Sequence, residues 1–171
     1  MLLANVILGL VALSTLCLIV FLADSFFGKL DFITHKAVVG DVITIIKQKG
    51  LEGGNFYDLG SSRGALAVRV ARKLPRLKVN GIDDNWSRVL FARVRALLIQ
   101  NIRFNREDVF TADVSVANIV YIYLPQDLME GLRAKLQKEL KPGSWIISYK
   151  VSFANWQAAE TLGQLFIYQM T

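Results

Sequence analysis

The chain has 171 residues, of which 53% are hydrophobic, and it carries a formal net charge of +6. This length suits one globular domain with its own core, plus an apolar segment at the amino end. A single cysteine excludes an intrachain disulfide. Because the chain also has only one histidine, no Cys/His zinc site is expected, and we predict no metal.

The first 23 residues contain no charged side chain. A run of this length reaches the ~20 apolar residues that cross a hydrocarbon core. The basic start and the short apolar run of ~7–15 residues that mark a signal peptide are both missing. We therefore predict a transmembrane anchor over 1–23 and a domain over 24–171, with a buried helix or a signal peptide as alternatives. Because lysines only follow the run, we expect a single-pass membrane protein with its domain on the cytoplasmic side, or on the matrix side in a mitochondrion.

Strand-like and helix-like segments alternate after a first amphipathic helix that ends near Gly50. This alternation predicts parallel strands with right-handed crossovers, so the fold class is α/β with a doubly wound, Rossmann-like sheet. The residues around Gly163 predict a C-terminal antiparallel hairpin at the sheet edge. The predicted strands are 55–60, 77–83, 101–108, 117–125 and 144–151, and the predicted helices between them are 65–74, 87–99 and 126–140.

Basic residues are concentrated in the middle of the chain. Eleven Lys or Arg residues lie between positions 63 and 106, against two acids. Such a face attracts anionic lipid, acidic protein or nucleic acid, and ordinary solvated helix faces are the alternative. We expect the membrane to be contacted through the N-terminal helix, and we expect no nucleic-acid partner.

The turn DLGSSRG at 58–64 carries the strongest signal for a ligand. Asp58 and Ser61 come with Gly60 and Gly64, which let the backbone approach a ligand closely, with helix N–H groups behind the turn. Ligands of an open parallel sheet bind beyond the carboxyl ends of its strands. The turn therefore lies where a cofactor would bind.

Acidic residues also end the next two predicted strands. Asp83, with Asp84 and Asn85 after it, ends the second strand, where a carboxylate accepts hydrogen bonds from ribose hydroxyls. Asp108 follows the third strand, where it would meet an adenine amine. Each acid alone is as readily a turn or helix cap. In this order and in this frame they predict an adenosine-containing cofactor.

S-adenosylmethionine is the predicted cofactor. The turn lacks the middle glycine of GxGxxG, and the chain has no Gly-Lys-Ser/Thr of a P-loop. A dinucleotide and a nucleoside triphosphate are therefore disfavoured. S-adenosylmethionine has no phosphate and tolerates a looser turn.

The stretch from about 32 to 168 resembles a class I, seven-strand S-adenosylmethionine-dependent methyltransferase. It is most similar to the membrane-anchored protein-lysine methyltransferases that include those of the ATP synthase c-subunit and of the adenine nucleotide translocase. The matching motifs are DLGSSRGA at 58–65, GIDDN at 81–85 and SFANW at 152–156. The resemblance implies a lysine of a membrane or membrane-associated protein as the methyl acceptor.

Two residues of the turn depart from the family pattern, because Ser62 replaces a glycine and Arg63 replaces an acid. A serine fits there without strain only where φ is negative. Arg63 either pairs with the carboxylate of the cofactor or blocks the site.

Two aromatic residues are predicted to be catalytic. The fourth predicted strand ends in YIYLPQD, which puts Tyr123 at the cofactor's edge, and Trp156 follows the fifth strand. We expect them to line a channel for a substrate lysine. The absence of an Asn-Pro-Pro-Tyr motif disfavours adenine and glutamine as acceptors. A small-molecule or lipid methyltransferase and a non-catalytic membrane scaffold remain as alternatives.

Overall fold

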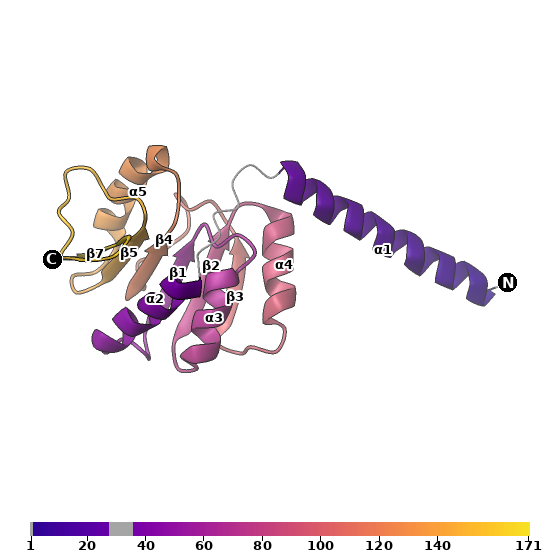
Figure 1. Cartoon of the computed structure of the whole chain (residues 1–171), viewed down its shortest axis with the longest axis horizontal. Helices are drawn as coiled ribbons and strands as arrows, with labels where there is room; N and C mark the ends of the chain where they lie inside the picture. The colour runs from indigo at the N-terminus through magenta and orange to yellow at the C-terminus, as the bar shows by residue number, and fades with distance from the viewer. Residues whose placement is uncertain (1, 28–35) are drawn as a thin grey trace. The chain divides into compact units, whose positions relative to one another are not determined.

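The structure, a computed structural model, describes residues 2–27 and 36–171 (Figure 1). The chain divides into two units, Met1–Asp31 and Phe32–Thr171. The first unit holds α1, Leu2–Phe27, which continues past the predicted anchor end at Ala23. Its segment Leu2–Ile19 is exposed and has a mean hydropathy of 2.5, so α1 is long and apolar enough to cross a membrane. The predicted start of the family resemblance, near Phe32, lies outside the described residues.

The second unit is built on a seven-stranded sheet of order β3-β2-β1-β4-β5-β7-β6. Strands β1 to β5 pair in parallel, and β7 runs antiparallel to both β5 and β6. The predicted doubly wound sheet with a C-terminal hairpin is therefore confirmed. The strands are β1 Asn55–Leu59, β2 Lys78–Asp83, β3 Ile102–Arg106, β4 Ile119–Ile122, β5 Trp145–Tyr149, β6 Glu160–Leu162 and β7 Leu165–Gln169, and the helices are α2 Lys36–Gln48, α3 Ala65–Lys73, α4 Trp86–Ala96 and α5 Gln126–Glu139.

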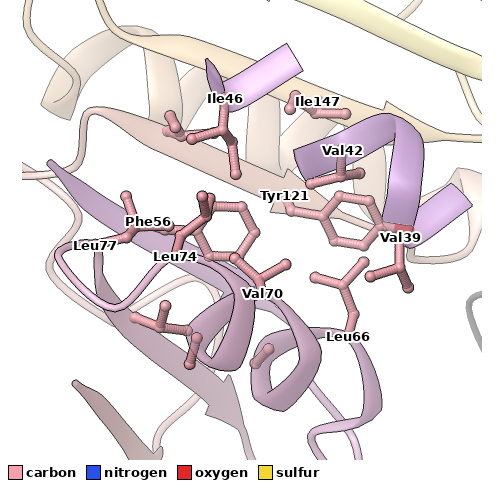
Figure 2. Packing of buried hydrophobic residues seen from close by; sticks show 14 of the residues in the cluster. Val39, Val42, Ile46, Phe56, Leu66, Val70, Leu74, Leu77, Tyr121 and Ile147 are labelled. Atoms are coloured by element: carbon pink, nitrogen blue, oxygen red, sulfur yellow. The ribbon is translucent and has the colours of Figure 1, made fainter. Parts of the chain in front are cut away.

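The sheet separates two hydrophobic cores. On one face Phe56 of β1 and Tyr121 of β4 are buried between Val42 of α2 and Val70 of α3, as Figure 2 shows. The core of the other face includes Met129 and other residues of α5. Strands of a parallel sheet are covered on both faces, which is why β4 consists of four buried residues in succession.

One part of the second face has no helix over it. Residues 107–118, all of which the structure describes, connect β3 to β4 through turns alone. Lys78 and Arg103 are exposed there, next to Asn80 and Tyr57. A groove of about 400 Å³ opens at the amino ends of these strands, the end opposite to the predicted site.

Candidate functional site

The loops after β1 and β4 meet where the strand order reverses. Strand β1 lies between β2 and β4: the chain runs outward from β1 through β2 to β3 and then crosses back to β4 on the other side of β1. A Cβ atom on Gly60 would lie 2.6 Å from Cδ2 of Leu124, so the two loops are in direct contact. This point of an open parallel sheet is where ligands bind.

The turn after β1 folds over the end of β2. The backbone N–H groups of Gly60 and Ser61 both donate to the carbonyl oxygen of Ile82, at 2.9 and 2.8 Å. Gly60 and Gly64 have φ of 76° and 71°, which residues with a Cβ rarely adopt. A Cβ on Gly64 would also lie 2.5 Å from Cζ of Phe104. Glycine is therefore required at both positions.

Ser62 has φ of 47°, so the negative φ that would leave a serine unstrained is not adopted. A left-handed conformation costs a residue with a side chain about 1–2 kcal/mol. The backbone N–H of Ser62 donates to Oδ2 of Asp83 at 2.9 Å. This hydrogen bond to a charged group offsets the strain and holds the turn against β2.

Asp83 is buried, with 4% of its surface exposed, at the end of β2. Its Oδ1 accepts a hydrogen bond from the backbone N–H of Asn85 at 3.0 Å. Burial raises the pKa of its carboxyl group, and the hydrogen bonds from Asn85 and Ser62 oppose that rise. An ionised carboxylate has about four acceptor positions, so Asp83 can still accept two hydroxyl hydrogen bonds.

Asp58 is also buried, at the end of β1. Burial, together with the nearby charge of Asp83, raises its pKa to about 7, while a hydrogen bond from the backbone of Ala67 in α3 opposes the rise. Two carboxyl groups at neighbouring strand ends stabilise a cation between them. The site is therefore suited to a ligand that carries positive charge.

The hydroxyl oxygen of Ser61 is buried and has no hydrogen-bond partner among the described residues. Buried polar atoms are rarely left unpaired. This Oγ atom lies 2.9 Å from the place that a Cβ on Gly81 of β2 would take, so it is positioned in the glycine turn to meet a polar ligand atom. Glycine turn, unpaired hydroxyl and two carboxyl groups fit a cofactor with ribose hydroxyls and a cationic amino-acid end.

Three other predicted residues lie at the same edge and hold local structure. Oδ1 of Asn85 accepts from the backbone N–H groups of Ser87 and Arg88 and so caps α4. Oδ1 of Asp108 accepts from the backbone N–H of Phe110 at 2.7 Å. Asp84 is exposed, and its carbonyl oxygen accepts from Nε of Arg106.

An aromatic pair lies at the carboxyl ends of β4 and β5. The ring centroids of Tyr123 and Tyr149 lie 4.7 Å apart in an edge arrangement. The Nζ atom of Lys150 lies 5.5 and 5.2 Å from the centroids of these two rings. A hydrogen bond with Tyr123 is the main cause that raises the pKa of Lys150. Tyr149 and Lys150 were not predicted from the sequence. Their position at the end of the predicted fifth strand could have indicated that they lie at the same edge of the sheet as Tyr123.

Trp156 is not brought together with Tyr123. Its ring centroid lies 5.3 Å from that of Phe153 and 5.0 Å from that of Tyr168. These aromatic residues belong to the core that includes α5, whereas Tyr123 packs against the core on the opposite face of the sheet.

One family model matches more than half of the chain. The family model of the ANTKMT methyltransferase domain matches residues 58–160. A protein-lysine N-methyltransferase from Saccharolobus islandicus is 29% identical over 115 residues, covering 62% of this chain and 68% of the relative. A carboxy-S-adenosyl-L-methionine synthase from Haemophilus ducreyi is 31% identical over 122 residues, covering 61% of this chain and 47% of that one.

A solved structure shares the fold. An RNA methyltransferase from Salinibacter ruber, crystallised with S-adenosyl-L-homocysteine, superposes with a TM-score of 0.74 at 27% identity. The match covers 81% of this chain and 93% of that chain. The similarity therefore extends over nearly the whole second unit.

Proposed function

The chain belongs to the family of ANTKMT methyltransferase domains, and from this we propose that it methylates lysine side chains of a protein in or at a membrane. It is an S-adenosylmethionine-dependent methyltransferase, so the family, the enzyme class and the cofactor predicted from the sequence are confirmed. The lysine acceptor is supported by the name of the Saccharolobus relative. The membrane location is supported by the length and composition of α1.

We assign the cofactor to the turn after β1 and to the ends of β2 and β3. Asp83 would accept hydrogen bonds from the ribose hydroxyls, and Asp58 would face the cationic end. The turn Gly60–Gly64 and the hydroxyl of Ser61 would hold the methionine part. Asp108 would contact the adenine amine, and Asp84 and Asn85 would lie beside the ribose.

When bound, S-adenosylmethionine supplies an electrophilic methyl group, and the protein's task is to align a nucleophile with it and to exclude water. The acceptor amine attacks only when neutral. Aromatic rings attract the charged ammonium, and the raised pKa of Lys150 beside Tyr123 shows this effect, so the rings serve to bind the acceptor lysine, which must then lose its proton before transfer. Tyr123 and Tyr149 are the rings at this place, and Trp156 remains a predicted second contact.

The observation that supports a lysine acceptor best is the position of Lys150. Its ammonium group lies over both tyrosine rings at the carboxyl edge of the sheet. Cations are attracted to the faces of aromatic rings by the ring quadrupole. An aromatic pair that accommodates one lysine side chain is suited to receive another.

Membrane anchoring through α1 would favour a membrane-bound substrate. A tether raises the local concentration of the enzyme beside its target without any new contact. The single-pass arrangement with the domain on the cytoplasmic or matrix side stays part of the proposal.

The test is a transfer assay with isotopically labelled S-adenosylmethionine and isolated membranes that contain the full chain. Label recovered as methyl-lysine after protein hydrolysis supports the proposal. Label in the organic extract identifies a lipid acceptor, and label in RNA would place the activity with that of the Salinibacter protein. The variant Asp83→Asn should lose the label, and Asp127→Asn, an exposed acid in the first turn of α5, is the matched control.

A further inference from the structure

The outer face of α4 carries an exposed apolar stripe. Trp86, Leu90 and Val94 are 54%, 52% and 56% exposed, and Leu97 just beyond the helix is 76% exposed. These positions are spaced by four, four and three residues, so they share one side of the helix. We call these four residues the α4 stripe. Leu98, 97% exposed, extends it.

The exposure of the stripe follows from how α4 packs. Its buried residues are Val89 and Ala92, which join the core shared with α2 and α3. At 100° per residue they lie on the opposite side of the helix from Leu90 and Val94. Single exposed apolar side chains are ordinary, but a continuous group of large ones marks a contact surface.

Arginine residues border the stripe on both sides. Arg93 lies along one border and is exposed, and Arg95 lies beyond the other border and is exposed too. The guanidinium carbon of Arg95 lies 5.0 Å from the ring centroid of Phe91, and its Nη1 donates to the carbonyl oxygen of Arg63 at 3.3 Å. Helix α4 contains no acidic residue. The surface is therefore apolar in the middle and positive at its edges.

We propose that the α4 stripe docks on the surface of an anionic lipid bilayer. Helices that lie in a membrane interface have apolar residues with Trp on one face and Lys or Arg beside them. Arginine stems can follow the apolar surface while their charged ends reach the lipid phosphates. The docking rests on the proposed membrane location of the chain and is independent of the acceptor.

Charge favours lipid over a second copy of the chain. Two stripes placed face to face would bring their bordering arginines together, and like charges across an interface are repelled. Helix α4 has no acidic residue that would pair with these arginines across such an interface. An anionic surface neutralises the same residues.

Docking would also orient the site. Trp86 follows directly after Asn85, which caps α4 at the carboxyl edge of the sheet. Lipid contact at Trp86 would therefore bring the end of β2, with Asp83, close to the bilayer surface. A lysine at the membrane surface would then be within reach of the site.

The test uses the full chain reconstituted in vesicles with brominated acyl chains, which quench tryptophan fluorescence on contact. Vesicles of phosphatidylcholine alone are compared with vesicles of phosphatidylcholine and phosphatidylglycerol in equal parts. Subtracting the emission of Trp86→Phe isolates Trp86 from Trp145 and Trp156. We expect most of the Trp86 emission to be lost in the anionic brominated vesicles and far less in the neutral ones.

Matched variants assign the effect to the stripe. Leu90→Ser with Leu97→Ser should restore the Trp86 emission, and Leu162→Ser, at a residue 46% exposed on β6, should not. Replacing both Arg93 and Arg95 by Gln should abolish the difference between the two lipid compositions. Thermal unfolding checks that each variant stays folded, since Nε of Arg93 donates to the carbonyl oxygen of Phe104.

Three results would overturn the docking. Trp86 emission could be equal in brominated and plain vesicles, or quenching could be equal in neutral and anionic ones. Protection of Trp86 from the brominated lipid that disappears at fewer protein chains per vesicle would show that the stripe binds a second copy of the chain. None of these results depends on enzyme activity. If the chain methylates lysine but Trp86 is not quenched, the membrane docking of the stripe is wrong and the proposed function is unaffected.

Discussion

The backbone N–H of Ser62 donates a 2.9 Å hydrogen bond to Oδ2 of Asp83. One contact thus joins the strained turn after β1 to the buried acid at the end of β2. In the proposed site the same carboxylate accepts from the ribose, so the shape of the turn and the affinity for the cofactor would depend on one residue.

Asp83→Ala should weaken binding of S-adenosylmethionine roughly 10- to 100-fold, because a hydrogen bond to a charged group contributes about 1.5–3 kcal/mol. Calorimetric titration measures the change. Asp127→Ala, on the exposed start of α5, should bind as the original chain does. Unchanged affinity in folded Asp83→Ala would remove Asp83 from the site.

Ser62→Gly should raise the free energy of unfolding by about 0.5–1 kcal/mol, since relief of the left-handed strain exceeds the entropy that glycine adds to the unfolded chain. The backbone hydrogen bond to Asp83 is kept. Urea unfolding measures the change. Gly64→Ala, at φ 71° and against Phe104, should be destabilised in the same experiment. A less stable Ser62→Gly would mean that the serine side chain contributes more than its backbone strain costs.

Asp58→Asn should be more stable than the original chain at pH 8 and about equally stable at pH 4. The pKa of Asp58 is raised from 3.8 to about 7 in the folded state, so its ionisation is disfavoured there. The free energy of unfolding of the original chain is therefore unreduced by Asp58 below pH 4, and it falls as the pH rises through about 7. The gain at pH 8 is on the order of 2–4 kcal/mol. Urea unfolding across this pH range checks it, and a pH-independent difference would contradict it.

Binding of S-adenosylmethionine near pH 7 should release a proton. A cation beside Asp58 favours its ionised form and so lowers its pKa on binding. Calorimetry in buffers of different ionisation enthalpy measures the number of protons released. Asp58→Asn is the control and should release none. Release that persists in this variant would assign the proton to another group.

Tyr123→Phe should lower kcat/KM for the protein substrate about tenfold or more, with cofactor affinity unchanged, because it removes one hydroxyl hydrogen bond from the acceptor edge. Tyr168→Phe serves as the comparison, since it also removes one hydroxyl, which accepts a hydrogen bond from the backbone N–H of Phe153 in the core of the other face. Equal losses in both variants would indicate that packing rather than acceptor contact is responsible.

The α/β alternation and the turn at 58–64 were readable from the sequence because both are local. Periodicity reports which residues a strand or helix buries, and a glycine turn followed by acids at strand ends needs no knowledge of distant neighbours. The boundaries were less accurate, since α4 ends at Ala96 and the apolar residues Leu97 and Leu98 lie in a turn rather than in the predicted helix.

Other properties were decided only by tertiary structure. Lys150 meets Tyr123 because β5 lies beside β4, and Trp156 turns to the core of the other face because its loop packs against Tyr168. The φ of Ser62 is set by a hydrogen bond to a strand that lies twenty-one residues further along the chain. The sequence by itself determined the fold class, the family and the cofactor, because these follow from local pattern. Which side chains meet, and which apolar face of α4 stays exposed, depends on how strands and helices pack, and no local pattern contains that information.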